Sequence, residues 1–274
     1  MLPTTPPIAE LAAPANWRVV DFISDLHLQA SEPRTLRLWE RYMARTEADA
    51  VFILGDLFEA WIGDDALSAT RADASTPKPS FEDHCAHSLK EASRHRAIFF
   101  MRGNRDFLLG AACAQACGMQ LLADPTVLAF AGQRWLLTHG DALCLDDTQY
   151  LQFRAQVRGS QWQQDFLAKP LAERRAIAQA LRKQSEARKR SGALHGDVDT
   201  AAARHWLAAA SARELIHGHT HRPADHDLGQ GCVRHVLTDW DGAAMPVRAQ
   251  VLRLRLGSSD DGVALQRLDP LHAS

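Results

Sequence analysis

Seven side chains with metal-ligand chemistry stand directly after five β-rich runs of this 274-residue chain. A mixed oxygen and nitrogen set without thiolates suits Mn, Fe, Zn or Co better than Ca or an iron–sulfur cluster. Seven ligands exceed what one ion normally takes from a protein, but they fit two ions if one carboxylate bridges. Two ions about 3.5–4 Å apart can clamp a phosphate and activate a water for in-line attack. The seven residues are Asp25, His27, Asp56, Asn104, His139, His217 and His219.

The spacing of these residues predicts that they converge. Asp25 and His27 are two residues apart, so on an extended strand their side chains face the same side. His217 and His219 share that spacing, although the glycine between them indicates a tight loop. Each motif alone is ordinary, because Gly-Asp and Gly-Asn after a strand are usually turns. Five such motifs in series, each after a β-rich run, favour one dinuclear site.

Short β-rich or apolar runs precede the motifs and would position them. Ligands of open α/β sheets gather at the carboxyl ends of strands. Continuous apolar runs such as 50–54 and 97–101 are typical of strands buried on both faces. We predict strands at 18–23, 50–54, 97–101, 127–130, 134–138, 215–216, 233–237, 247–256 and 263–268. We also predict helices at 35–45 and 81–94, and a polar loop at 66–80.

The middle of the chain has a different composition. Residues 146–210 are rich in Ala, Gln, Arg and Leu with few β-branched residues, which predicts several helices inserted into the strand pattern. Early alternation of strands and helices, followed by strands alone, predicts an α/β fold with mixed sheets. We expect one domain over 17–274 with a helical lid over about 146–210, after a loose proline-containing leader over 1–16.

Composition excludes several classes of protein. Apolar residues make up 46% and charged residues 23%, as in an ordinary soluble globular protein. The net charge of −2 is unlike that of a strongly basic nucleic-acid binder. No apolar run reaches the length of about 18 residues that a spanning helix needs, and the N-terminus lacks a secretory signal. The five cysteines indicate free thiols in a reducing cytosol.

The motifs together carry a resemblance to known proteins. DLH (25–27), GD (55–56), GNRD (103–106), HGD (139–141) and HGHTH (217–221) resemble the calcineurin-like metallophosphoesterase superfamily. The longer runs ILGDLFEAWIGDD, GNRDFLLG, THGDALCLDD and IHGHTHRP resemble, more narrowly, the UDP-2,3-diacylglucosamine pyrophosphatase family of lipid A synthesis. These runs include many residues that metal binding does not need, and the resemblance covers about residues 17–240.

The resemblance implies a fold, a ligand set and a reaction. The fold is a sandwich of two mixed β-sheets flanked by helices, with the helical lid inserted. Asp25, His27, Asp56 and His219 would hold one ion, and Asp56 would bridge to a second ion held by Asn104, His139 and His217. The usual metal of the family is manganese. The reaction is hydrolysis of a UDP-linked, doubly acylated glucosamine at the phosphorus on the uridine side, giving UMP and the acylated sugar 1-phosphate.

Arg105 stands where many relatives of the superfamily have a histidine. A guanidinium carries a permanent charge and a planar fork that suits phosphate oxygens. We hypothesise that Arg105 stabilises charge on the attacked phosphate, with Asn104 and His217 as the other catalytic residues. The alternative for Arg105 is an ordinary salt bridge, for example to Asp106. Asp64, Asp106 and Asp141 are expected to orient ligands or cap helices, and His221 is left outside the ligand set.

The resemblance also implies substrate contacts in the lid. Asp147 would contact the glucosamine portion, or it is a helix N-cap, which Asp equally favours. The family pattern Ser-x3-Asn-x2-Lys falls on Gln184, Arg188 and Ser191, where this sequence departs at all three positions. Either neighbours such as Lys189 and Arg190 substitute, or the alignment slips here. Further expected substrate contacts are Asn104, Arg105 and His217.

The charge of the insert bears on the partner. Residues 154–190 hold ten basic and three acidic side chains, a balance of +7. Such a run is ordinarily a solvated helix face. Beside a phosphate-cleaving site it favours a lid that attracts anionic lipid headgroups, so the protein would act in the cytoplasm, peripherally on the inner membrane. The apolar residues that either pack the insert or accept acyl chains are Phe153, Trp162, Phe166, Leu167, Leu171, Ile177, Leu181 and Trp206.

Three other functions compete with this interpretation. A soluble nucleotide-diphosphate hydrolase or phosphodiesterase would keep the chemistry and change the substrate. A binding scaffold would keep the fold, but such proteins typically lose ligands, and all seven are present. A nuclease is disfavoured, because the body is acidic and lacks the aromatic and basic groove of a nucleic-acid binder. We expect no nucleic-acid partner and no obligate protein partner.

Overall fold

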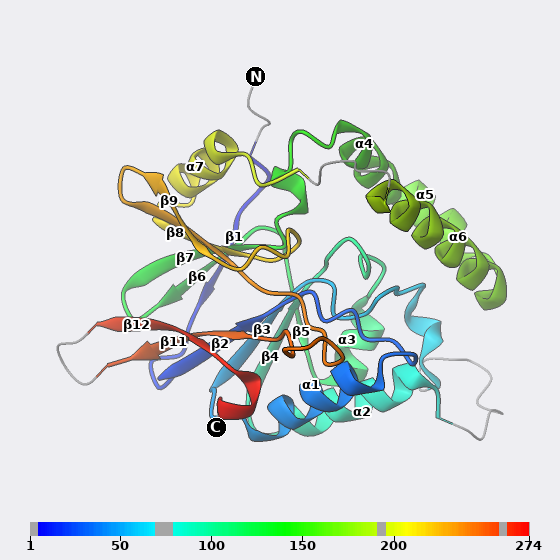
Figure 1. Ribbon diagram of the computed structural model, residues 1–274, viewed down its shortest axis with the longest axis horizontal. Coiled ribbons are helices and arrows are strands. Elements are labelled where there is room, and N and C mark those ends of the chain that lie inside the picture. The colour runs from blue at the N-terminus through cyan, green and yellow to red at the C-terminus, as the bar shows by residue number, and fades with distance from the viewer. Residues whose placement is uncertain (1–4, 69–78, 191–195, 258–261, 274) are drawn as a thin grey trace.

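Two six-stranded mixed sheets form the body of the protein. The computed structural model describes residues 5–68, 79–190, 196–257 and 262–273, without the side chains of 184–190 (Figure 1). One sheet has the order β12-β11-β2-β3-β4-β5 and the other β1-β6-β7-β8-β10-β9. The strands of the first sheet are β2 (Val19–Ile23), β3 (Ala50–Leu54), β4 (Ala97–Met101), β5 (Gln120–Leu122), β11 (Val251–Leu256) and β12 (Val263–Leu268). Those of the second are β1 (Ala9–Ala12), β6 (Thr126–Phe130), β7 (Gln133–Thr138), β8 (Glu214–His217), β9 (Asp225–Gly229) and β10 (Cys232–Val236).

The two sheets pack face to face, as the predicted sandwich requires. Strands β2 to β5 are parallel, and β11 closes the sheet on β2 antiparallel. The apolar runs at 50–54 and 97–101 are the central strands β3 and β4, buried by neighbours on both faces. Between the sheets, Phe52 stacks on Phe22 and Phe99 with ring centroids 5.3 and 4.6 Å apart. These rings meet apolar side chains of β6 and β7 in one buried cluster.

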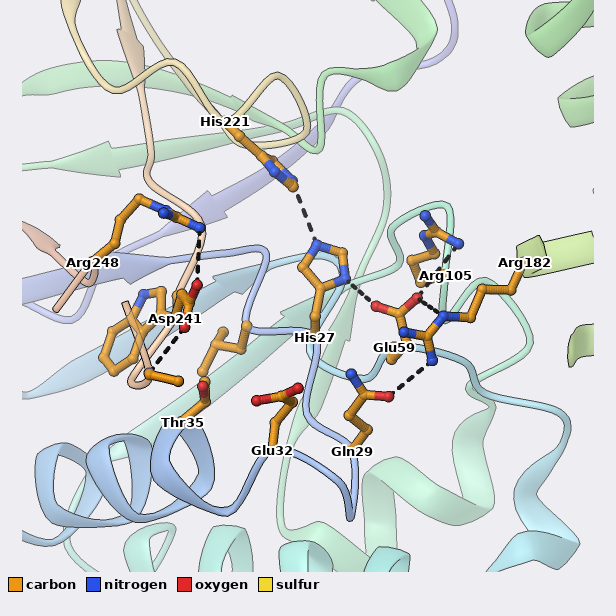
Figure 2. Close-up of a pocket in the computed structure, with 13 residues that line it drawn as sticks. His27, Gln29, Glu32, Thr35, Glu59, Arg105, Arg182, His221, Asp241 and Arg248 are labelled. Atoms are coloured by element: carbon orange, nitrogen blue, oxygen red, sulfur yellow. Dashed lines mark hydrogen bonds and ion pairs between the residues drawn. The ribbon is translucent and has the colours of Figure 1, made fainter. Parts of the chain in front are cut away.

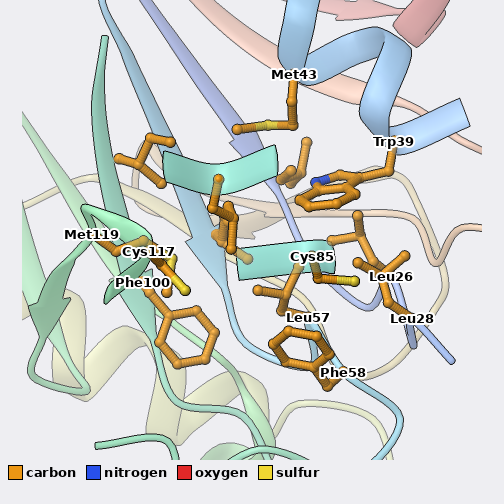
Figure 3. Close-up of a cluster of buried hydrophobic side chains, with 14 of the residues drawn as sticks. Leu26, Leu28, Trp39, Met43, Leu57, Phe58, Cys85, Phe100, Cys117 and Met119 are labelled. Carbon is orange, nitrogen blue, oxygen red and sulfur yellow. The ribbon is translucent and has the colours of Figure 1, made fainter. Parts of the chain in front are cut away.

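Helices cover the outer faces of both sheets. Three helices, α1 (Pro33–Arg45), α2 (Phe81–Ala92) and α3 (Ala111–Cys117), lie on the outer face of the β2–β5 sheet (Figure 1). Figure 3 shows Cys85 of α2 beside Leu57 and Phe58, with Trp39 and Met43 of α1 in the same apolar layer. The layer is what fixes the loops after β2 and β3, because Leu57 and Phe58 follow Asp56 directly.

The helical insert divides into two parts. Helices α4 (Thr148–Val157), α5 (Ser160–Leu167) and α6 (Leu171–Arg190) stand beside the body (Figure 1). Helix α7 (Thr200–Ala209) differs from the expected lid at 146–210 because it packs on the second sheet. There Trp206 and Leu207 are buried against Leu136 and Leu215. The stretch that projects over the body is therefore α4–α6 alone.

Several short elements escape the sequence pattern. Residues 9–12, inside the expected loose leader, form β1 and pair in parallel with β6, because Leu11 reaches the core between the sheets. Most of the expected loop at 66–80 lies outside the described residues. Within the part of the chain that the structure describes, no helix is long and apolar enough to cross a membrane. The five cysteines are free thiols. The described residues also form 3-10 helices at Asp64–Ala66, Asp141–Leu143 and Pro270–His272.

Candidate metal centre

The carboxyl ends of five strands from both sheets meet at one place. Asp25 and His27 follow β2, Asp56 follows β3 and Asn104 follows β4 in the first sheet. His139 follows β7 in the second sheet, where His217 ends β8 and His219 lies just beyond it. The seven residues expected to be metal ligands thus occupy one region, built by loops that cross between the sheets.

Two groups of carboxylate and imidazole atoms are compact enough to hold an ion. One consists of Asp25, His27 and His221, the other of Asp25, Asp56 and His139, each with ligand atoms within 4.8 Å of one another. Nε2 of His221 lies 3.1 Å from Oδ1 of Asp25 and 3.4 Å from Nε2 of His27. His221, left out of the expected set, therefore lies among the candidate ligands, and Asp25 is common to both groups.

Asn104 links the remaining histidines to the second group. Its side-chain oxygen lies 2.9 Å from Nε2 of His139 and 2.8 Å from Nδ1 of His219. Nε2 of His139 is also 3.7 Å from Oδ1 of Asp56. An amide oxygen, two imidazoles and a carboxylate thus converge, and this donor chemistry suits a divalent transition metal.

Three histidines have one ring nitrogen fixed by an oxygen, which leaves the other nitrogen to face the site. Nδ1 of His139 donates to the carbonyl oxygen of Leu54 at 2.8 Å, and Nδ1 of His217 donates to that of Gly218 at 2.8 Å. Nδ1 of His27 lies 2.9 Å from the carboxylate of Glu59. Metal-bound histidines ordinarily use the second nitrogen in this way. Nε2 of His217 is buried without a hydrogen-bond partner among the described residues.

The charge of the site calls for a cation. The side chains of Asp25 and Asp56 are buried, and within the described residues their ion-pair partners are imidazoles only. Buried charges require a partner of opposite sign. Burial lowers the pKa of His217 to about 4, and burial together with the charge of His139 lowers that of His219 to about 3. Both imidazoles are thus neutral, as ligands must be, so the residues present fit a divalent metal.

The backbone at the site is strained. Among the described residues, eight non-glycine residues have a positive φ, and five of them belong to the site. Such conformations cost of order 1–3 kcal/mol each and persist where the surrounding structure enforces them. These left-handed residues lie in the turns after β2, β3 and β8. The five are Asp25, His27, Asp56, His219 and His221, with φ between 49° and 66°.

Asp106 holds the turn after β3 and the turn after β4 together. Its buried carboxylate accepts hydrogen bonds from the backbone N–H groups of Gly103, Leu57, Phe58 and Asp56 at 2.7–3.3 Å. Burial and the nearby charge of Asp56 raise its pKa to about 7. At Gly103, any Cβ would collide with the Asp56 carboxylate, so only glycine allows the β3 and β4 turns to approach. Asp106 is therefore an orienting residue, as expected.

The other two predicted orienting residues also bind backbone or helix groups. Asp64 accepts from the backbone N–H groups of Gly110 and Cys113 at 2.8 and 2.9 Å, at the start of α3. Asp141 accepts from the Tyr150 hydroxyl and, at 2.8 Å, from Nε of Arg154. Asp64 thus fixes the start of α3. Asp141 binds Tyr150 and Arg154 of α4, the first helix of the stretch α4–α6.

Arg105 has a different partner from the one expected. Its Nη1 lies 3.6 Å from Oε1 of Glu59 rather than beside Asp106, whose oxygens already accept four backbone groups. Glu59 also receives Nε of Arg182 at 3.2 Å, so this carboxylate joins His27, Arg105 and the lid helix α6 (Figure 2). Sequence reasoning missed Glu59, although it lies inside the run ILGDLFEAWIGDD.

Arginines anchor the lid to the body. Arg154 pairs with Asp141, Arg158 donates to the carbonyl oxygen of Gly103 at 2.9 Å, and Arg174 is buried on Asp65. Some of the arginines at 154–190 therefore bind carboxylates and carbonyl oxygens of the body. Tyr150, a second residue that sequence reasoning missed, also places its ring 5.8 Å from that of His219.

The predicted lid contacts have different outcomes. Asp147 is the N-cap of α4, because its side chain accepts from the backbone N–H of Tyr150 at 3.0 Å. Gln184 and Arg188 lie on α6 in the stretch whose side chains the structure does not describe. Ser191 lies outside the described residues. The headgroup contacts expected at these three positions therefore stay predictions.

The apolar residues of the lid divide in the same way. Phe166 is buried, and Trp162, Leu171 and Ile177 pack partly against the main core cluster. The ring of Trp162 lies 6.1 Å from that of Phe107 in the body. Three others remain exposed by more than a third: Phe153, Leu167 and Leu181.

Comparisons with known proteins found a family model, curated relatives and solved structures that this chain resembles. A family model described as calcineurin-like phosphoesterase matches residues 19–223, which include all seven expected ligands. A UDP-2,3-diacylglucosamine hydrolase of Chromobacterium violaceum is 48% identical over 227 residues, covering 81% of this chain and 91% of that protein. One from Xanthomonas campestris pv. campestris is 44% identical over 269 residues, covering 90% and 98%. Among solved structures, Vps29 of Entamoeba histolytica complexed with zinc has a TM-score of 0.43 at 15% identity, covering 92% and 99%.

Proposed function

The chain belongs to the calcineurin-like phosphoesterase family, and from that premise we propose that it is a UDP-2,3-diacylglucosamine hydrolase of lipid A biosynthesis. It cleaves the pyrophosphate bond of its substrate and releases UMP and 2,3-diacylglucosamine 1-phosphate. The observation that carries this proposal is identity of 44–48% to hydrolases of that name over 80–90% of the chain. The cluster of buried ligands at the strand ends supports it, because that cluster suits metal-dependent hydrolysis.

The ligand set proposed for two Mn²⁺ ions is Asp25, His27, Asp56, Asn104, His139, His217 and His219, with His221 as a further candidate. When bound, two such ions would offset phosphate charge and lower the pKa of an attacking water. The chain itself holds the ligand nitrogens in place through Leu54, Gly218 and Glu59. This preorganisation costs nothing at the moment of reaction.

Arg105 is the proposed electrostatic group for the attacked phosphate. Its backbone N–H donates to Oδ1 of Asp56 at 2.8 Å, which fixes the residue beside the ligands. Its side chain lines the cavity at His27 and is only loosely paired with Glu59. A guanidinium held at this distance can turn to phosphate oxygens without breaking a tight ion pair. Arg182 of α6, which reaches the same carboxylate, brings a second positive charge from the lid.

The lid is the proposed site of the acyl chains and of membrane contact. The exposed Phe153, Leu167 and Leu181 stand on helices that carry an excess of Lys and Arg. Such helices bind at the surface of an anionic membrane through apolar burial and charge together. We propose that the protein works peripherally on the cytoplasmic face of the inner membrane, with Asp147, Gln184, Arg188 and Ser191 as further candidate contacts for the substrate.

The test is an assay of metal-stripped protein on UDP-2,3-diacylglucosamine in detergent, with and without added Mn²⁺, followed by detection of UMP. Release of UMP only when metal is added supports the reaction, the substrate and the metal together. Cleavage of bis-p-nitrophenyl phosphate without UMP release from the lipid would contradict the lipid substrate and favour a soluble phosphodiesterase. Retention of full activity by the metal-stripped protein would contradict metal dependence.

A further inference from the structure

A cavity of about 380 Å³ adjoins the candidate metal centre. Figure 2 shows it running from Arg105 and Arg182 on the lid side, past His27, to Thr35 and Asp241 at its far end. The near end thus lies at the ligands and the phosphate-binding cations. The far end is formed by the start of α1 and by the loop that follows β10, neither of which has a part in the proposed chemistry.

The far end is preformed by hydrogen bonds to the site. The backbone N–H of Trp240 donates to the carbonyl oxygen of Asp25 at 3.0 Å, which ties the loop after β10 to a ligand. The backbone N–H of Gly242 donates to the hydroxyl of Thr35 at 3.0 Å, which ties the same loop to α1. A ligand at this end would therefore meet a wall already in place, and preorganisation of that kind favours binding.

The lining of the far end suits a hydroxyl-bearing group, because its arginine, Arg248, is already paired with Asp239 and Asp241. Glu32 is half-buried at the start of α1 and makes no capping hydrogen bond there, so its carboxylate is an available acceptor. Leu26 and Trp240, which are 0% and 4% exposed, form the apolar floor of this end, and the indole N–H of Trp240 has no partner among the described residues. A carboxylate repels a phosphate but accepts hydrogen bonds from ribose hydroxyls, as acidic residues do in dinucleotide sites.

The two ends of the substrate require different surroundings. Acyl chains need an apolar surface, and the lid side offers the exposed Phe153, Leu167 and Leu181. Because the acyl chains are attached to the glucosamine itself, the sugar must lie on the lid side as well. The pyrophosphate would then cross His27 and Arg105, and the nucleoside would extend to the far end of the cavity.

We propose that this far end is the nucleoside subsite, in which the Glu32 carboxylate accepts hydrogen bonds from the ribose hydroxyls and the base lies against Leu26 and Trp240. The inference rests on the proposed function, since it assigns one half of that substrate to a place. Glu32 is a binding residue for the leaving nucleotide, and it has no part in holding the metal.

The test is binding of nucleotides to manganese-loaded protein, measured by titration calorimetry with UMP and with 2′,3′-dideoxyuridine 5′-monophosphate. A lost hydrogen bond to a charged group weakens binding about tenfold or more. Glu32→Gln should therefore raise the Kd for UMP about tenfold while leaving the Kd for the dideoxy analogue unchanged. The control Glu91→Gln, at a partly exposed residue of α2 paired with Arg94, should change neither value.

Two results would overturn the subsite. One is no binding of UMP to the wild-type protein, or an unchanged Kd in Glu32→Gln. The other is an equal loss for UMP and the dideoxy analogue, which would mean a general disturbance of the cavity. Failure of the proposed function is recognised separately: the wild-type protein would bind UMP through Glu32 yet release none from UDP-2,3-diacylglucosamine.

Discussion

Strand β2 carries a buried aspartate, Asp21, at its centre, and a second, Asp25, follows just past its carboxyl end; the two have opposite surroundings. Asp21 is bound by Nε and Nη2 of Arg253 at 2.7 and 2.9 Å and by the hydroxyls of Tyr42 and Thr46. Asp25 is equally buried but has imidazoles and a serine hydroxyl around it. The charge of Asp21 is balanced by Arg253 of the chain itself, whereas the charge of Asp25 suits a metal cation. We infer that Asp21 serves stability and that Asp25 serves metal binding.

Removing a ligand should have the largest effect, and it should fall on activity alone. His139→Ala and Asn104→Ala are each expected to lower hydrolysis at least about a thousandfold, because the ion they would hold supplies several kcal/mol to the transition state. Circular dichroism and thermal melting should show folded protein in both variants. Full activity with two metal ions still bound, measured by elemental analysis, would contradict the ligand assignment.

Removing the partner of Asp21 should lower the free energy of unfolding and leave activity unchanged. Arg253→Met leaves a buried carboxylate unpaired, so we expect a loss of about 3 kcal/mol in the free energy of unfolding. Metal content and turnover of the folded fraction should not change. The control is Arg255→Met, two residues along the same strand, whose side chain is 39% exposed and should contribute less than about 1 kcal/mol. Equal losses in the two variants, by denaturant titration, would remove the contrast between Asp21 and Asp25.

Arg105→Ala tests a residue that is bound to Asp56, on the metal-binding side of the comparison. If this guanidinium stabilises phosphate charge, its loss should lower kcat/KM about a hundredfold. Metal content should stay at the wild-type level, because the metal-ligand side chains are left intact. Unchanged kcat/KM would leave Arg105 only its ion pair with Glu59.

The pH dependence of metal binding should give the smallest effect. Burial alone would lower the pKa of His139, but the charges of Asp56, Asp141 and Asp25 outweigh it and raise the pKa to about 9. Because Nδ1 donates to Leu54, the proton that must leave below that pH is the one on Nε2. Affinity for Mn²⁺ should therefore rise about tenfold per pH unit between about pH 6 and 8. Calorimetry in two buffers should show release of about one proton, and a flat profile would contradict this.

The sequence predicts the site better than its surroundings. The ligands follow buried strands, and the carboxyl ends of such strands must meet, so the convergence of Asp25, Asp56 and Asn104 could be predicted without coordinates. The sandwich of mixed sheets follows from the same strands and is confirmed. The expected ligand His217 ends β8, whose pairing with β7 brings it beside His139.

What escaped prediction depends on partners far along the chain. Strand β1 is four residues long, and only its pairing with β6 makes it a strand. The helical pattern of α7 gives no sign that it packs on the second sheet rather than with the lid. Glu59 is one of many carboxylates in the sequence, and its role depends on three partners brought by β2, β4 and α6. Propensity and periodicity carry no information on such choices.

The antiparallel pairing of β11 with β2 also sets the order in which this protein can fold during synthesis. Leu252 pairs with Phe22, so one edge of the apolar strand β2 stays open until the ribosome has made nearly the whole chain. Open edges of this kind are templates for aggregation. The strand that closes the edge also delivers Arg253 to Asp21. Nascent chains that stall before residue 250 would therefore expose the unpaired edge of β2 and leave the charge of Asp21 without Arg253. We expect such chains to depend on chaperones until β11 has been synthesised.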